Sequence, residues 1–243
     1  MSASCTLPPL PSGWPYAARN TGDPEARILD ASIPGLGSGW TLCLRAPVPL
    51  DAAKGEMPEA FGRGGIQRLG EVVLRPYRRG GLVRHVNERR YSSPERFARE
   101  FAVHQALWSA GFPTVEPLGY GFRAHLLGVE GVFFTRYVEA KAWPTLWGSS
   151  AQVIPELARL LDALVAWGLH APDLNATNIL LTPEGRVLAL DWDRARWLTS
   201  QDLLPRYHER LLRSLRKLGA PAQVIAAFAR SADAQREAVH DNG

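Results

Sequence analysis

The sequence predicts an α+β fold with two lobes, a small β-rich N-lobe and a mainly helical C-lobe. Up to about residue 139, short apolar and β-branched runs alternate with glycine-rich turns, a pattern typical of strands. Beyond that residue, longer stretches carry apolar side chains at helical spacing. The 243 residues are enough to bury one sizeable core or two small ones. We therefore divide the chain into a weakly ordered leader (residues 1–25), an N-lobe (26–139) and a C-lobe (140–243).

Composition narrows the class of protein. Hydrophobic residues make up 46% of the chain and charged residues 21%, as in folded globular proteins. No uninterrupted apolar run reaches about 18 residues, and the N-terminus lacks the basic and then apolar pattern of a secretory signal. Two cysteines are too few for a disulfide framework. We expect a protein of the reducing, cytoplasmic compartment, and the net charge of +4 favours anionic partners without choosing among them.

The N-lobe begins with two expected strands, at 27–30 and 40–44, to which we assign no function. A glycine cluster then precedes a strand at 71–75 that ends in a cation, Arg75. Backbone N–H groups of a glycine-rich segment can approach a phosphate closely. The cluster, Gly62, Gly64 and Gly65, is therefore a candidate phosphate loop, although a plain hairpin turn explains glycines alone equally well.

An arginine-rich segment follows this strand. Arg78 and Arg79 precede two glycines, and three more arginines occur by residue 90. A solvated charged loop is one interpretation. The other is a flexible clamp for the phosphates of a substrate or nucleotide, since guanidinium groups bind phosphate bidentately.

A helix is expected between Ser93, a good N-cap, and Gly111, a good C-terminal stop. Glu100 lies at the margin of its inward face, where a carboxylate needs a partner. Arg75 is the candidate partner, and a surface glutamate is the alternative. Helical spacing predicts that the inward face consists of Phe97, Phe101, His104 and Trp108. A buried strand at 131–139 then leads out of the N-lobe.

The segment 168–196 contains the most informative pattern in the chain. Two apolar runs, 179–181 and 187–190, flank a Thr-Pro-Glu-Gly turn and predict a hairpin. Antiparallel pairing would place Asn178 and Asp191 at its open end, with Asp173 on the incoming loop. Oxygen ligands of this kind suit Mg²⁺ with bound phosphates. A solvated loop with turn-forming Asp and Asn is the alternative.

The remaining C-lobe is expected to be helical, with helices at 151–167, at 201–218 and from Pro221 onward. The helix at 201–218 has an apolar face and a separate basic stripe. That stripe suits an anionic membrane surface or an anionic substrate, although a solvated helix face explains it as well. Its members are Arg206, Arg210, Arg213 and Lys217.

The spacing in 168–196 resembles that of protein-kinase-like enzymes. Asp-Leu-x-x-x-Asn followed by Asp thirteen residues later is similar to their catalytic loop and metal-binding Asp. The resemblance implies a bilobal protein-kinase-like fold in which Asp173 orients or deprotonates the attacking hydroxyl. Asn178 and Asp191 would hold the metal ions. The sequence departs from the pattern at Ala171, where a kinase histidine usually stands, and at Trp192.

The resemblance also implies which N-lobe residues bind the nucleotide. The glycine cluster and Arg75 would bind the nucleotide phosphates, with Glu100 paired to Arg75. Arg78 is an alternative phosphate ligand. The strand at 131–139 would continue into a hinge that reads adenine.

Across residues 60–218 the chain resembles the Kdo kinases, bacterial lipopolysaccharide kinases that phosphorylate 3-deoxy-D-manno-octulosonic acid (Kdo). The motifs that carry the resemblance are Gly-Arg-Gly (62–64), Val-Leu-Arg-Pro-Tyr-Arg-Arg-Gly-Gly (73–81), Arg-Glu-Phe (99–101), Asp-Leu-Asn-Ala-Thr-Asn-Ile-Leu (173–180), Asp-Trp-Asp-Arg-Ala-Arg (191–196) and Arg-Ser-Leu-Arg-Lys (213–217).

This resemblance implies ATP- and Mg²⁺-dependent transfer to the 4-hydroxyl of Kdo on Kdo-lipid A precursor. It also implies a peripheral place on the cytoplasmic face of the inner membrane of a Gram-negative bacterium. Arg78, Arg79, Arg213 and Lys217 would contact the substrate. The alternatives are a kinase for another sugar or small molecule and a catalytically silent nucleotide-binding protein. No motif supports nucleic-acid binding, and the oligomeric state stays open.

Overall fold

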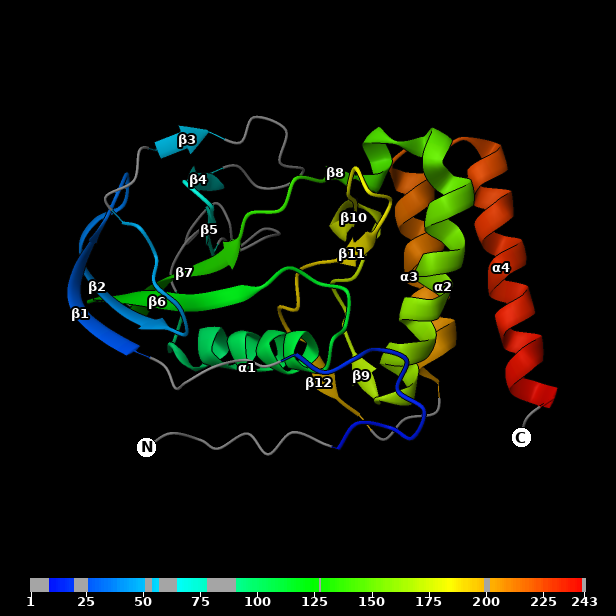
Figure 1. Ribbon diagram of the computed structural model, residues 1–243, viewed down its shortest axis with the longest axis horizontal. Coiled ribbons are helices and arrows are strands. Elements are labelled where there is room, and N and C mark those ends of the chain that lie inside the picture. The colour runs from blue at the N-terminus through cyan, green and yellow to red at the C-terminus, as the bar shows by residue number, and fades with distance from the viewer. Residues whose placement is uncertain are drawn as a thin grey trace. The chain divides into compact units, whose positions relative to one another are not determined.

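The computed structural model describes residues 9–19, 26–50, 54–56, 65–77, 91–126, 128–198 and 202–241. They form two compact units (Figure 1). The sheet unit spans Arg19–Ser109 and Val115–Tyr137, and the helical unit spans Met1–Ala18, Ala110–Thr114 and Val138–Gly243. The predicted α+β class is confirmed, because an antiparallel sheet dominates one unit and helices the other.

The sheet unit is built on seven antiparallel strands. The strands expected at 27–30 and 40–44 are present and longer, and the strand expected at 71–75 is present one residue later, at 72–76. The strand expected at 131–139 starts and ends earlier, at Gly128–Arg136, and its neighbour β6 was not predicted. In spatial order the strands are β1 (Ala26–Ile33), β2 (Gly37–Leu44), β6 (Pro117–His125), β7 (Gly128–Arg136), β5 (Val72–Pro76), β4 (Gln67–Leu69) and β3 (Lys54–Glu56).

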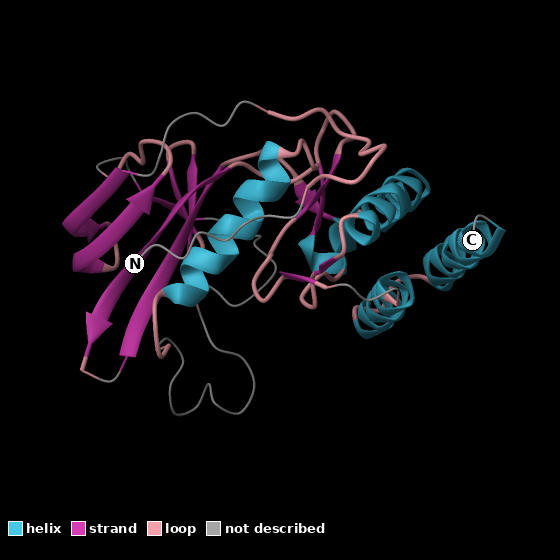
Figure 2. Ribbon diagram, turned by 90° about the horizontal axis from the view of Figure 1, so that it is seen from below, coloured by secondary structure: helices cyan, strands magenta, loops and turns pink. Residues whose placement is uncertain are grey.

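Helix α1 (Glu95–Ser109) covers one face of this sheet, against β6 and β7 (Figure 2). Phe97 packs directly on Gly131, where an added Cβ would lie only 2.3 Å from the ring. Three of the four predicted inward residues are buried, while Trp108 is half-buried beneath the guanidinium of Arg19. An aromatic cluster joins the helix to β7 and to Tyr77, the residue that directly follows the strand of Arg75.

Three helices dominate the helical unit and pack against one another: α2 (Ser150–Ala166), α3 (Leu203–Lys217) and α4 (Ala222–Asp241). Each lies close to its predicted range, because the apolar face of each is continuous in the sequence. None of the described helices combines the length and the apolar character needed to cross a lipid bilayer.

Short strands frame the loop segments of the helical unit. Strands β10 (Ile179–Leu181) and β11 (Val187–Ala189) form the predicted hairpin, and β8 (Lys141–Ala142) pairs with β10. Strand β9 (Leu169–His170) pairs with β12 (Arg196–Trp197), so the segment that contains the hairpin is closed at its base.

Part of the segment predicted as a weakly ordered leader lies against the helical unit. The indole of Trp14 donates a hydrogen bond of 2.6 Å to the carbonyl of Ala110 and packs on Phe112 and Trp167. Gly111 has a φ of +83°, and an added Cβ would lie 1.9 Å from the carbonyl oxygen of Ala17. A glycine after α1 is thus required both by backbone conformation and by the close approach of this segment.

Candidate active site

The β10–β11 hairpin brings two of the predicted site residues to one end. Ile179 pairs with Ala189, and the N–H of Leu190 donates to the carbonyl of Asn178 at 2.9 Å. The side-chain amide of Asn178 lies 3.5 Å from Asp191 Oδ2 and donates to the carbonyl of Asp173 at 3.0 Å. The predicted meeting of these three residues is confirmed, while the role of each stays a prediction.

The loop from Asp173 to Asn178 is held by a local side chain. Asn175 Oδ1 accepts hydrogen bonds from the N–H of Thr177 at 2.9 Å and from its hydroxyl at 2.5 Å. Its amide nitrogen donates to the carbonyl of Asp173 at 2.8 Å. This pattern favours the short 3₁₀ turn Ala176–Asn178, which leads into β10.

Helix α3 supports the same loop from its buried side. The hydroxyl of Tyr207 donates to the carbonyl of Leu169 at 2.5 Å and accepts from the N–H of Ala171 at 2.9 Å. Arg210 Nε donates to the carbonyl of Leu174 at 2.9 Å. Burial raises the pKa of Tyr207, which keeps the phenol protonated. Ala171 therefore contributes its backbone where a kinase histidine would contribute a side chain.

Arg194 is a site residue that the sequence did not single out. Its Nε lies 2.8 Å from Asp173 Oδ2 and its Nη2 lies 2.6 Å from Oδ1, so the pair is bidentate. Arg210 Nη2 lies 3.5 Å from the same Oδ1. The hydrogen bond to Asp173 raises the pKa of Arg194 above its ordinary value. The signal in the sequence was only an arginine three residues after Asp191.

The backbone around Asp191 is strained in a specific way. Asp191 and Arg194 have φ angles of +66° and +62°, in the left-handed region that favours glycine. Between them, Trp192 is fully buried and its indole donates to Thr114 Oγ1 at 3.1 Å. Trp192 thus anchors the turn in the core, while Asp191 and Asp193 on either side of it are half-buried.

His170, which stands one position before the usual kinase histidine, lies at the base of this segment. Strand pairing sets it opposite Arg196. Burial lowers the pKa of His170, and the charges of Arg196, Arg206 and Arg210 lower it further. The imidazole is therefore neutral near pH 7, and three arginines lie close enough to influence it.

The sheet unit contains the predicted ion pair. Arg75 Nη2 pairs with Glu100 Oε1, and the hydroxyl of Tyr77 donates to Oε2 at 2.5 Å. The Glu100 side chain is 1% exposed and that of Arg75 is 31% exposed. Glu100 is therefore a buried carboxylate and not the surface residue considered as the alternative. Tyr77 was not predicted as its second partner.

The structure describes only some of the other predicted site residues. Gly62, Gly64, Arg78 and Arg79 lie outside the described residues. Gly65 is exposed, with a φ of +94°. On α3 the stripe divides, because Arg210 contacts the Asp173 loop, whereas Arg206, Arg213 and Lys217 are exposed. Arg213 pairs with Glu209 one helical turn away.

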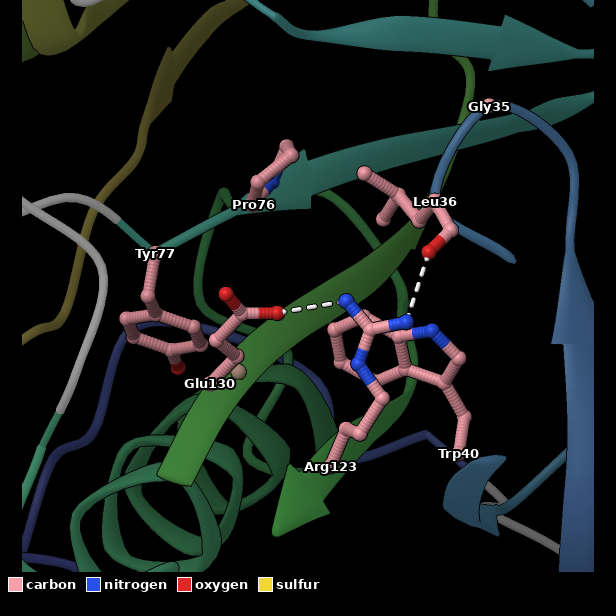
Figure 3. A pocket seen from close by; sticks show the side chains of 8 residues that line it. Gly35, Leu36, Trp40, Pro76, Tyr77, Arg123 and Glu130 are labelled. Atoms are coloured by element: carbon pink, nitrogen blue, oxygen red, sulfur yellow. Dashed lines mark hydrogen bonds and ion pairs between the residues drawn. The ribbon is translucent and has the colours of Figure 1, made fainter. Parts of the chain in front are cut away.

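A small cavity of about 90 Å³ lies within the sheet unit, and it is smaller than the roughly 300 Å³ of ordinary ligand pockets. Figure 3 shows Arg123 directed at the carboxylate of Glu130 and the carbonyl of Leu36, beside the ring of Trp40. Burial disfavours the Glu130 anion, but hydrogen bonds from Arg123 and His125 outweigh burial and hold the pKa of this carboxyl below its usual range. The lining residues are Gly35, Leu36, Trp40, Pro76, Tyr77, Arg123, Glu130 and Gly131.

With this geometry in place, comparison with known proteins identifies the family. The model of the lipopolysaccharide kinase (Kdo/WaaP) family matches residues 51–231. The chain belongs to this family. It is therefore a kinase, a phosphotransferase that uses a nucleotide.

Individual relatives carry the name 3-deoxy-D-manno-octulosonic acid kinase. The protein of Xylella fastidiosa (strain M12) is 33% identical over 175 residues, which cover 66% of this chain and 68% of that protein. That of Xanthomonas oryzae pv. oryzae (strain PXO99A) is 31% identical over 179 residues, covering 63% and 68%. A solved structure titled "A divergent kinase lacking the glycine-rich loop regulates membrane ultrastructure of the Toxoplasma parasitophorous vacuole" superposes with a TM-score of 0.43 at 12% identity, over 68% of this chain and 60% of that one.

For a lipopolysaccharide kinase, the donor set at the hairpin end is chemically suitable for Mg²⁺. Among the described residues, no three or more His, Cys, Asp or Glu side chains gather as a metal cage. Mg²⁺ in phosphoryl-transfer enzymes does not need one, since one or two protein oxygens and the substrate phosphates suffice. The Asn178 amide and the Asp191 carboxylate, side by side, fit that requirement.

Proposed function

We propose that this chain is an ATP-dependent kinase that phosphorylates the 4-hydroxyl of Kdo on Kdo-lipid A precursor. Family membership supports the reaction class, and the names of the relatives support the acceptor. The observation that carries the proposal is the meeting of Asp173, Asn178 and Asp191 at one end of a hairpin.

Asp173 positions the acceptor hydroxyl. In the reaction, the hydroxyl oxygen forms a bond to the γ-phosphorus of ATP while the bond from that phosphorus to the β,γ-bridging oxygen breaks, so that ADP leaves. The hydroxyl proton passes to the Asp173 carboxylate. Two side-chain amides on the carbonyl of Asp173, together with Arg210 on Leu174, hold the loop in place for this step.

Asn178 and Asp191 would hold Mg²⁺, which would neutralise charge on the nucleotide phosphates. In the sheet unit, Arg75 binds phosphate oxygens. Glu100 and Tyr77 restrict the orientation of Arg75. The Glu100 carboxylate is buried and accepts one hydrogen bond from Arg75 and one from the hydroxyl of Tyr77. An arginine held in this way binds with less loss of side-chain entropy.

We further propose that the protein acts on the cytoplasmic face of the inner membrane through electrostatic contacts. The basic face of α3 supports this, because Arg206, Arg213, Arg216 and Lys217 are exposed. The apolar face of α3 is buried in the helical unit, so this helix has no apolar side to insert into lipid. Attraction of exposed lysines and arginines to anionic lipids weakens with salt.

The test is phosphoryl transfer by the purified chain with Mg-ATP and Kdo-lipid A precursor, with the phosphorylated position located by NMR. Asp173→Ala should lower kcat by roughly 10²- to 10⁴-fold, the usual contribution of a general base, and should keep ATP affinity. Arg186→Met, an exposed substitution on the hairpin turn, is the control. Phosphoryl transfer to another sugar, with none to Kdo, would contradict the proposed acceptor and leave the kinase activity supported.

A further inference from the structure

The carboxylate of Asp173 is in direct contact with the guanidinium of Arg194. An ionised carboxylate offers about four lone-pair positions. Arg194 takes one on each oxygen, and Arg210 approaches Oδ1 at 3.5 Å. A hydroxyl that comes within hydrogen-bonding distance of Asp173 therefore also comes within reach of Arg194.

The two arginines on Asp173 are held very differently. Arg210 is anchored at its Nε by the carbonyl of Leu174. Both hydrogen bonds of Arg194 within the described residues go to Asp173 itself, and its side chain is 59% exposed. Arg194 can therefore turn toward another carboxylate without losing a structural contact elsewhere. Asp173 keeps Arg210 as a neighbouring cation if that happens.

The backbone conformation at Arg194 also indicates a use for its side chain. A left-handed φ of +62° costs a non-glycine residue about 1 kcal/mol or more, whereas glycine adopts it without that cost. Conformation alone would favour glycine at this turn. The chain instead has an arginine there, and its guanidinium contacts Asp173, the residue proposed to accept the proton of the acceptor hydroxyl.

The surroundings are suited to an anionic ligand. Arg196 on β12 and Arg206 and Arg210 on α3 all lie close enough to His170 to disfavour its protonated form. The acidic groups that act on Arg194 are Asp173, Asp191 and Asp193. An anion that approaches Asp173 thus meets Arg194 and Arg210 directly, with Arg196 and Arg206 near His170 in the same segment.

We propose that Arg194 binds the carboxylate of the sugar acid acceptor and thereby selects acceptors that carry one. The inference rests on the proposed function, because the acid group of Kdo is what Arg194 would recognise. The carboxyl carbon of Kdo and the carbon bearing its 4-hydroxyl are separated by two carbons. A guanidinium beside Asp173 is therefore suitably placed, and its planar fork matches a carboxylate bidentately.

The experiment changes both residue 194 of the protein and the carboxylate of the acceptor. Wild type, Arg194→Met and Arg194→Lys are assayed on the Kdo acceptor and on the same acceptor with its carboxylate converted to an amide. Arg194→Met should lose roughly 10- to 100-fold in kcat/KM on the acid, as expected for a charge-assisted pair, and should change little on the amide. Arg194→Lys should recover part of the loss. Arg159 on α2 is also exposed and paired with a carboxylate, and Arg159→Met should behave as wild type on both acceptors.

The outcomes separate this inference from the proposed function. If Arg194→Met loses the same factor in kcat/KM on the acid and on the amide, Arg194 only positions Asp173 and the inference is overturned. If kcat/KM falls on neither acceptor, the inference is overturned as well. Activity on the amide also shows that the variant is folded. No transfer by wild type to either acceptor would overturn the proposed function, and the inference with it.

Discussion

The Arg75–Glu100 pair allows the sharpest test of the sheet unit. Arg75→Met removes the guanidinium and keeps most of the side-chain volume over Tyr77 and Phe133. It leaves the Glu100 carboxylate, which is 1% exposed, without its arginine. Breaking one side of a buried ion pair typically costs about 3–5 kcal/mol of unfolding free energy. Because Arg75 is itself 31% exposed, we expect the lower end, about 3 kcal/mol.

The double variant Arg75→Met/Glu100→Leu distinguishes stability from function. Removing both charges also removes the buried uncompensated carboxylate, so most of the stability should return. The remaining deficit should be about 1 kcal/mol, because the hydroxyl of Tyr77 loses its hydrogen bond to Glu100. Phosphoryl transfer should stay low in both variants, since neither has the Arg75 guanidinium proposed to bind the nucleotide phosphates.

Unfolding free energies come from urea titrations followed by circular dichroism, and kinase activity from initial rates at varied ATP. Arg68→Met is the matched control. It removes an arginine from the neighbouring strand, where the pair with Glu71 is exposed and should contribute less than about 1 kcal/mol. A loss from Arg75→Met as small as the control, or a double variant as unstable as the single one, would refute the reasoning.

Two further predictions follow from buried polar groups. Burial lowers the pKa of His104 to about 3, so the folded state keeps it neutral while the unfolded state protonates below about pH 6.5. Stability should therefore fall as the pH drops from about 6.5 toward 3, by about 2 kcal/mol at pH 5 from this residue alone, and urea titrations should show a shallower pH dependence for His104→Gln. Equal slopes for variant and wild type would contradict this. Tyr207→Phe leaves the carbonyl of Leu169 and the N–H of Ala171 without the hydroxyl, which should cost about 2–4 kcal/mol and lower kcat by loosening the loop before Asp173. The half-buried Tyr137→Phe is the control, and the same loss there would show that the loop is not the cause.

Much of the site could be predicted from the sequence because its pattern is local. Asp173, Asn178 and Asp191 lie within one loop and hairpin, and two apolar runs joined by a turn with Pro and Gly are enough to bring the hairpin ends together. The pairing of Arg75 with Glu100 was predictable for a different reason. A helical carboxylate facing the core must have a partner, and a strand cation was available.

The residues that hold these groups could not be predicted in the same way. The hydrogen bonds of Tyr77, Tyr207 and Arg210 join residues that are far apart in the sequence, and hydrophobic periodicity does not predict such pairs. The basic stripe of α3 shows the limit well. Helical spacing grouped Arg210 with Arg213, but packing of α3 beneath the Asp173 loop turned only Arg210 toward the site.

By itself, then, the sequence determined the α+β class, the helices, the hairpin and the chemistry-bearing carboxylates, because short-range periodicity and turn chemistry specify them. Only the tertiary structure decided that Trp192 is a core anchor, that Glu100 is shared by Arg75 and Tyr77, and that Arg194 closes on Asp173. These contacts depend on which side chains meet when separate segments pack. Spacing along the chain carries no record of that.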